Sequence, residues 1–124
     1  MLDNTGMKNF LELDVYKRSS GLFPKVYKIV RSWNRDDQKE LGSQLIRSAN
    51  SIHANIAEGF SKSRKDFARY ISTSIGSCDE TRSHIIDALN IGLIDETLMK
   101  NLIAEYEIVG KQLTKLKQFL LSSD

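Results

Sequence analysis

Four segments of the sequence repeat their apolar residues at spacings of three, four and seven, which is the period of an α-helix. This pattern constrains the fold more than any other feature, because each helix then has one apolar face that it must bury. We expect helices near residues 11–33, 37–58, 64–91 and 96–121. The connections between them are short, so consecutive helices should pack antiparallel. The sequence therefore predicts an all-α fold, an up-and-down antiparallel four-helix bundle.

The apolar stripes also identify the expected core. A chain of 124 residues suits one domain with a sizeable interior. We therefore expect a single domain over residues 1–124, of which residues 1–8 are flexible. The expected core residues are Leu11, Val15, Leu22, Val26, Ile29, Trp33, Leu41, Leu45, Ala49, Ile52, Ile56, Phe67, Ile71, Ile75, Cys78, Ile85, Leu89, Leu98, Leu102, Val109, Leu113, Leu116 and Leu120.

Residues that favour helix ends stand at the expected boundaries. Asp37, Ser63 and Asp95 can accept a hydrogen bond from a backbone N–H in the first turn of the helix that follows each of them. Gly59 and Gly92 stand where the second and third helices should end, because glycine adopts the left-handed conformation of a helix C-terminus without a steric cost.

Pro24 opposes this pattern, since it lies inside the first predicted helix. Proline removes a backbone hydrogen bond and crowds the preceding turn, at a cost of about 3 kcal/mol in an ideal helix. We expect a kink or a break in the first helix at this point.

A second apolar stripe lies beside the core stripe of the first helix. It consists of Tyr16, Phe23, Tyr27 and Val30, at spacings of seven, four and three. Further apolar residues widen the faces of the last two helices: Ile86, Ile103 and Ile108. A single bundle leaves such surface uncovered, and uncovered patches commonly mark interfaces. We expect a homo-oligomer, the alternative being ordinary surface tyrosines with hydrated hydroxyls.

Charge is distributed unevenly along the chain, although the net charge is only +2. Residues 1–70 carry 13 Lys and Arg against 8 Asp and Glu, whereas residues 71–110 carry 2 against 7. Such segregation allows a protein to attract a polyanion to one surface. Alternatively, two oppositely charged faces pair with each other, within or between subunits.

The basic half supplies the candidate residues for binding RNA or DNA. Phosphate contacts require only flexible cations at sufficient density, and neighbouring tyrosines can stack on bases. Without a base-reading motif, such binding should be sensitive to salt and weakly selective for sequence. The alternative is a solvated basic face without a ligand. The candidates are Lys17, Arg18, Lys25, Lys28, Arg31, Lys62, Arg64, Lys65 and Arg69.

The end of the second helix and the middle of the third are rich in small and polar residues. Asn and Ser are mediocre helix formers, and a glycine inside a helix costs up to about 1 kcal/mol relative to alanine. Such residues either cap helices and let them approach closely, or meet polar groups of a partner. We place the following residues, with Tyr16, Phe23 and Tyr27, at the interface of the oligomer: Asn55, Glu58, Gly59, Gly76, Ser77 and Glu80.

The run Asn55-Ile56-Ala57-Glu58-Gly59, followed by Gly76-Ser77 and Glu80, resembles the signature of a bacterial family of four-helix bundles. Its founding members are encoded within intervening sequences of large-subunit ribosomal RNA genes and are described as ribosomal-protein-like. The accessory variability determinant of diversity-generating retroelements is similar in fold. The opening Leu13-Asp14-Val15-Tyr16-Lys17 also matches, so the resemblance covers nearly the whole chain. The chain departs from the family at His53, where the family usually has proline, and at Pro24.

The resemblance implies a homopentamer with a basic surface that binds nucleic acid or a ribonucleoprotein, for example a ribosomal component. In the retroelement branch it also implies docking onto a reverse transcriptase. A protein-binding accessory subunit of a retroelement reverse transcriptase is therefore the alternative function.

Catalytic and metal sites have little support in the sequence. Arg47 and His53 are spaced as in HEPN ribonucleases, but six residues along a helix turn the two side chains about 120° apart. Glu80 and His84 share one helix face without matching ligands from another helix. Cys78 lies on a core stripe, where a thiol is typically inert. We therefore expect no enzymatic activity, no metal and no cofactor.

The sequence also favours one cellular compartment. With a single cysteine the chain forms no internal disulfide, and its first residues lack a basic, apolar leader. No apolar run approaches the roughly 20 residues that span a bilayer. We expect a cytoplasmic protein that does not act at a membrane.

Overall fold

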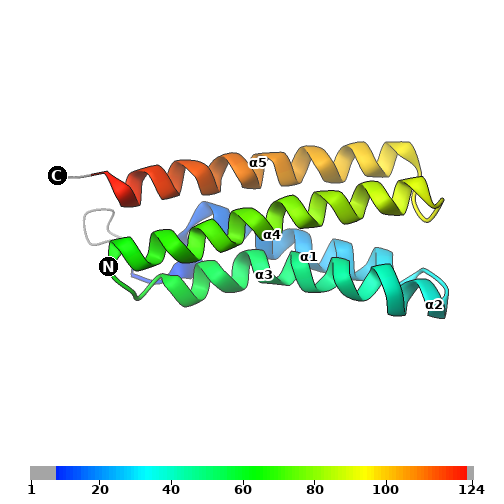
Figure 1. The fold of residues 1–124 in the computed structure, drawn as a ribbon, viewed down its shortest axis with the longest axis horizontal. Helices are drawn as coiled ribbons and strands as arrows, with labels where there is room; N and C mark the ends of the chain where they lie inside the picture. The colour runs from blue at the N-terminus through cyan, green and yellow to red at the C-terminus, as the bar shows by residue number, and fades with distance from the viewer. Residues whose placement is uncertain (1–7, 123–124) are drawn as a thin grey trace.

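The computed structural model describes residues 8–122 and confirms the predicted all-α bundle (Figure 1). A short 3-10 turn, η2 (Phe10–Glu12), leads into the first long helix, α1 (Asp14–Arg31). The last two long helices are α4 (Arg64–Asn90) and α5 (Glu96–Leu121). Residues 1–7, which belong to the segment predicted to be flexible, lie outside the described residues.

The second long helix is built from three pieces that follow one another without a gap. They are α2 (Arg35–Asp37), a π-helical turn η3 (Gln38–Gly42) and α3 (Ser43–Gly59). Gly42 closes the π turn and lies close to α1, where an added Cβ would stand 2.5 Å from Cγ1 of Val30. The close approach to α1 therefore requires glycine at this point.

The helices pack around the bundle in the order α1, α3, α4 and α5 (Figure 1). The α3–α4 and α4–α5 contacts are the most extensive, and the α1–α5 contact is the least. It follows that the side formed by α1 and α3 is opposite the side formed by α4 and α5. In the same way, the α3–α4 side is opposite the α1–α5 side. Among the described residues, no helix is both long and apolar enough to cross a membrane.

Most of the expected core residues are buried, and each helix contributes fully enclosed side chains such as Val26, Ile52, Ile71 and Val109. The prediction that Leu11 belongs to the core was wrong, since this residue is 56% exposed. It lies in η2, before α1 begins, so the period of α1 does not apply to it.

The helix caps were predicted correctly at two of the three starts. Ser63 accepts a hydrogen bond from the N–H of Asp66, and Asp95 accepts one from Leu98. The prediction for Asp37 was wrong, because the cap of α2 is Asn34, whose Oδ1 accepts the Asp37 N–H at 2.9 Å.

The two predicted terminal glycines act in different ways. Gly92 has a φ of +80° and ends α4 in the expected left-handed conformation. The N–H of Leu93 then bonds to the carbonyl of Ala88, and that of Gly92 to the carbonyl of Leu89, which satisfies two carbonyls of the last turn. Gly59 has no positive φ and is needed for close packing: an added Cβ would lie 2.7 Å from Cβ of Tyr70.

Pro24 neither breaks nor ends the first helix, since α1 continues through it to Arg31. The predicted break was therefore wrong. Pro24 lies on the exposed face of α1. There, water can satisfy the carbonyl that loses its helical N–H partner, which lowers the cost of proline inside a helix.

The two glycines Gly59 and Gly76 should respond in opposite ways to alanine. Gly59→Ala forces a methyl group against Tyr70 and Phe67, so we expect the free energy of unfolding in urea to fall by about 1–3 kcal/mol. Gly76→Ala is the matched control, because its Cβ would meet nothing within 4 Å. Alanine should raise stability there by up to about 1 kcal/mol through better helix propensity. Equal effects at the two positions would contradict this assignment.

Candidate nucleic-acid interface

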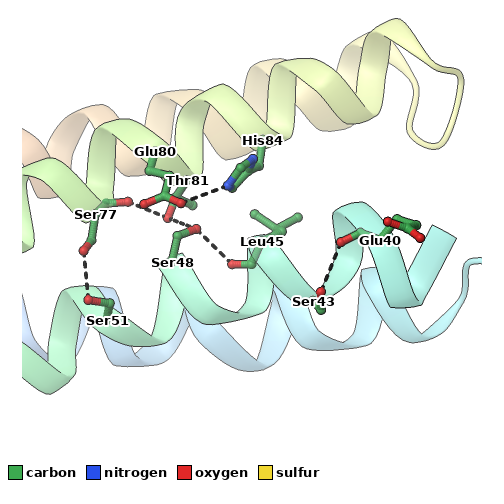
Figure 2. A network of polar contacts seen from close by, with 9 residues as sticks. All are labelled: Glu40, Ser43, Leu45, Ser48, Ser51, Ser77, Glu80, Thr81 and His84. Atoms are coloured by element: carbon green, nitrogen blue, oxygen red, sulfur yellow. Dashed lines mark hydrogen bonds and ion pairs between the residues drawn. The ribbon is translucent and has the colours of Figure 1, made fainter.

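A row of small hydroxyl side chains joins α3 to α4, and we call it the hydroxyl seam (Figure 2). Its members are Ser48 and Ser51 on α3 and Ser74, Ser77 and Thr81 on α4. Ser77 Oγ donates to Ser51 Oγ at 2.8 Å, and Thr81 Oγ1 lies 2.9 Å from Ser48 Oγ. Ser74 Oγ donates to the carbonyl of Ile52 at 2.7 Å. The polar cluster recognised in the sequence thus connects two helices of one chain.

The hydroxyl seam changes the interpretation of the predicted oligomer interface. Ser77 is buried in the seam, and Gly59 is buried against α4, so packing within one chain accounts for both. We do not assign these two residues to a contact between subunits. Asn55 is half-buried and donates to the carbonyl and hydroxyl oxygens of Ser51. Its placement at an interface stays a prediction, as does that of three exposed residues: Glu58, Gly76 and Glu80.

The second apolar stripe of α1 is partly covered within the protomer. Val30 is 1% exposed and belongs to the core, which corrects its assignment to an uncovered stripe. Tyr16 and Phe23 are half-buried, and their rings pack edge-on against the His53 ring of α3, with centroids 5.8 and 5.6 Å away. Tyr27 is 39% exposed. The uncovered part of the stripe is therefore smaller than the sequence indicates.

The predicted cations of α1 lie mainly on one exposed face. Lys17, Arg18 and Lys25 line an open groove of about 500 Å³ between α1 and α5. Lys28 follows on the same helix face, three residues beyond Lys25. The charge of Arg18 is partly neutralised in this groove, because its Nη1 forms an ion pair of 3.0 Å with Glu105 of α5.

Arg31 is directed away from this groove. Its Nη1 donates to the hydroxyl of Tyr27 at 2.9 Å, and its guanidinium lies 5.6 Å from the centre of the Tyr27 ring. Arg31 also lines a groove between α1 and α3. It therefore belongs to a different surface from Lys17 and Lys25.

The second group of predicted cations surrounds the start of α4. Lys62 and Arg69 line an open hollow of about 420 Å³ between α3 and α4, together with Asn55 and Tyr70. Asp66 lies in the same hollow and pairs with Arg69 at 3.8 Å, which reduces its positive potential. Lys65 is exposed nearby on the first turn of α4.

Arg64 has a structural role that the sequence did not reveal. Its Nη2 donates to the carbonyl of Phe119 at 2.5 Å and its Nε to that of Leu120 at 3.4 Å. The guanidinium also lies 4.6 Å from the centre of the Phe119 ring. Arg64 thus caps the C-terminus of α5, whose last carbonyls have no partner within the helix. We therefore remove it from the nucleic-acid set.

The structure does not bring the two groups of cations together. The α1–α5 groove and the α3–α4 hollow lie on opposite sides of the bundle, given the order of the helices. The two groups therefore do not form one continuous basic surface. The α5 residues that complete the first groove, Glu105 and Gln112, were not predicted, because they are about 90 residues from α1 in the sequence and carry no motif.

Cys78, His84 and His53, three of the groups considered for catalysis, are buried or partly buried, whereas Arg47 is exposed. Burial raises the pKa of the Cys78 thiol to about 11, and its Sγ donates to the carbonyl of Tyr106. His84 Nε2 lies 3.2 Å from a carboxylate oxygen of Glu80. His53 is packed between two aromatic rings, and its Nδ1 is buried. Within residues 8–122, no group of three or more His, Cys, Asp or Glu side chains is placed to hold a metal ion.

The fold and these surfaces define an all-α, up-and-down bundle with exposed cations in two open grooves. Residues 11–115 match the family model of the 23S rRNA-intervening sequence protein, and the chain therefore belongs to this family. This confirms the resemblance seen in the sequence for the intervening-sequence proteins, while the relation to retroelements stays a prediction.

A solved structure supports the fold. It is a protein of unknown function from the S23 ribosomal protein family of Bacteroides thetaiotaomicron, with a TM-score of 0.77. The two chains are 20% identical over 84% of this chain and 95% of the other. At this identity the similarity shows the fold alone. No curated protein matches the chain.

The partial burial of His53 predicts a pH dependence of stability. Burial lowers the pKa of His53 below its ordinary value of 6.5, because the imidazolium loses hydration. Its contribution to stability is complete above pH 6.5 and is lost as the pH falls through the lower pKa of the folded state, since the unfolded chain binds the proton first. We expect the free energy of unfolding of the wild type to fall more steeply below pH 6.5 than that of His53→Gln. Parallel pH curves for the two proteins would contradict this.

Proposed function

We propose that the chain is a non-enzymatic homo-oligomer that binds nucleic acid, or a ribonucleoprotein, through the exposed lysines of α1. The observation that carries the proposal is the row of Lys17, Lys25 and Lys28 on one exposed helix face, beside the α1–α5 groove. Eleven residues of helix separate the first from the last, so the row extends over about 16 Å. This length suits several successive phosphates of a nucleic-acid backbone, which carry one charge per about 3.4 Å in each strand of a duplex.

The chemistry of this surface fits backbone binding better than base recognition. Lysine ammonium groups attract phosphate as mobile point charges and carry little information about sequence. The groove has Asp14 and Glu105 at its edges, which limits how deeply a polyanion can enter it. We therefore expect phosphates to lie along the exposed face of α1, above the groove.

RNA is the first ligand to test. The family is named for the intervening sequence of 23S ribosomal RNA, and the related solved structure is assigned to a ribosomal protein family. The first description names ribosomal RNA, and the second names a ribosomal protein family of another protein. The alternatives of a ribonuclease or a reverse-transcriptase subunit gain no comparable support. In particular, the rings of Tyr16 and Phe23 pack against His53, where a ribonuclease would need an accessible acid or base.

Neutralising the row should weaken RNA binding and its dependence on salt. For Lys17→Gln/Lys25→Gln/Lys28→Gln, we expect the slope of log K against log [salt] to decrease by about 2, or about 0.7 for each lost contact with a single strand. The measurement is fluorescence anisotropy with a labelled single-stranded RNA at several salt concentrations.

A matched control separates local contacts from net charge. Lys100→Gln/Lys111→Gln/Lys115→Gln removes three exposed charges from α5 and should leave the slope nearly unchanged. The proposal fails if both triple variants lower the slope equally, or if the wild type shows no binding even at low salt. Cleavage of the RNA by the wild type would instead support the ribonuclease.

A further inference from the structure

The groove between α1 and α3 carries positive charge that no acidic residue balances. It has a volume of about 590 Å³ and lies between the C-terminal half of α1 and the N-terminal half of α3, at the end of the molecule that carries α2 (Figure 1). Arg31 and Arg47 line it, and no aspartate or glutamate among residues 8–122 does so. The α1–α5 groove and the α3–α4 hollow both contain acidic residues. Of these three surfaces, the α1–α3 groove therefore has the most strongly positive potential.

The two arginines of this groove also lack the anionic partners that other arginines of the chain have. Arg18 and Arg82 each form an ion pair with a carboxylate, at 3.0 and 2.7 Å. Arg47 forms no hydrogen bond or ion pair with any group that the structure describes. Arg31 bonds to the neutral hydroxyl of Tyr27 and keeps its full charge. Because a guanidinium presents a planar fork of N–H groups, both arginines are suited to hold phosphate oxygens.

Aromatic rings stand beside these cations. Phe23, Tyr27 and Arg31 follow one another at spacings of four residues, so they lie along one face of α1 over about 12 Å. Phe23 lines the groove, and its ring centre is 6.1 Å from that of Tyr27. Tyr27 is 39% exposed, and its ring and hydroxyl together hold the guanidinium of Arg31 in place. An accessible aromatic ring can stack on the planar base of a nucleotide.

The packing of α1 on α3 brings Arg47 to the opposite wall of the groove. Val30 lies against Gly42 near one end of the contact, and the ring of Phe23 lies against that of His53 further along. Arg47 is between these two points of α3, so it faces the segment of α1 that carries the aromatic rings. The two arginines thus approach the groove from different helices.

We infer that the α1–α3 groove binds a free nucleotide, with its phosphates between Arg31 and Arg47 and its base on the exposed ring of Tyr27. Two guanidinium groups favour a diphosphate over a single phosphate, since each can take two oxygens. Asn50 is exposed and lines the same groove, and its amide can donate to or accept from a ribose hydroxyl. The volume is within the range of about 300–1,000 Å³ that is typical of ligand sites.

This site is separate from the proposed RNA-binding face and goes beyond the proposed function. Lys17 and Lys25 line the groove between α1 and α5, whereas the nucleotide site is on the α1–α3 side. The end of an RNA strand shares the chemistry of a phosphate beside a base. A free nucleotide differs from it because its binding does not require the row of lysines.

Calorimetric titration with ADP tests the site, and pyrophosphate and adenosine are the partial ligands. ADP is a sufficient probe because stacking accepts any base. We expect ADP to bind more tightly than either partial ligand. Arg31→Gln and Arg47→Gln should each weaken ADP binding about tenfold or more, since each removes hydrogen bonds to a charged group. Arg69→Gln removes the same charge from the α3–α4 hollow and should leave ADP binding nearly unchanged.

Substitution of Tyr27 tests the contact with the base. Tyr27→Leu removes the aromatic ring, so the affinity for ADP should fall about fivefold or more, to that of pyrophosphate. Tyr27→Phe keeps the ring and removes the hydroxyl that accepts from Arg31. This variant should therefore still bind ADP more tightly than pyrophosphate.

Several results would overturn the inference. They are a wild type that does not bind ADP or binds it no more tightly than pyrophosphate, and equal losses in Arg47→Gln and Arg69→Gln, which indicate attraction by net charge alone. Binding of a 5′-phosphorylated RNA through Arg31 and Arg47 without binding of ADP would also contradict it. Arg47→Gln should unfold at the temperature of the wild type, because Arg47 bonds to no described group, so its loss of ADP binding is not a loss of folding.

A last variant separates this inference from the proposed function. Lys17→Gln/Lys25→Gln/Lys28→Gln should bind ADP as the wild type does while its RNA binding is weakened. Loss of ADP binding in this variant would place the nucleotide on the lysine row and overturn the site between α1 and α3. Failure of RNA binding in the wild type leaves the ADP titration unaffected, so the two proposals fail separately.

Discussion

The close contact between α3 and α4 is the constraint on which the rest of the bundle depends. Gly59 lets the end of α3 lie against Tyr70, and the hydroxyl seam continues the contact through Ser48, Ser77 and Thr81. Each hydrogen bond of this kind contributes about 1 kcal/mol net, but an unpaired buried hydroxyl costs about 1–3 kcal/mol. The seam therefore fixes the register of the two helices more than it adds stability, because a shift along the axis would unpair several groups at once.

This register sets the position of the surfaces. With α3 and α4 fixed, α1 packs on α3 and α5 packs on α4, while α1 and α5 have the least extensive contact of the four. The groove that carries Lys17 and Lys25 lies along this last contact. Arg31 and Arg47 line a groove on the α1–α3 side, and Asp87 and Glu107 line one on the α4–α5 side. These two sides face away from each other, because each contains one helix of the central pair. The segregation of charge along the sequence thus becomes a segregation between sides of the molecule.

The fold could be predicted from the sequence because its determinants are local. Helical periodicity gave the four helices, and Ser63, Asp95 and Gly92 marked their ends through contacts within four residues. The wrong assignments concern side chains whose partners are distant in the sequence. Arg64 meets carbonyls 55 and 56 residues away, and Ser77 meets Ser51 on another helix. Side chains of the right type for an interface or for phosphate binding were therefore assigned outward, although they pair within the chain.

The exposed face of α1 contains two residues that packing does not require. An added Cβ at Gly21 would meet nothing within 4 Å, and Pro24 points to solvent, yet both weaken a helix. Both lie on the same side of α1 as Lys17, Lys25 and Lys28. Their common property is that neither presents a long side chain, so the helix backbone stays accessible between the lysines. A polyanion that lies along α1 would approach the helix most closely there, which is consistent with the position of glycine and proline on this face and not on the buried one.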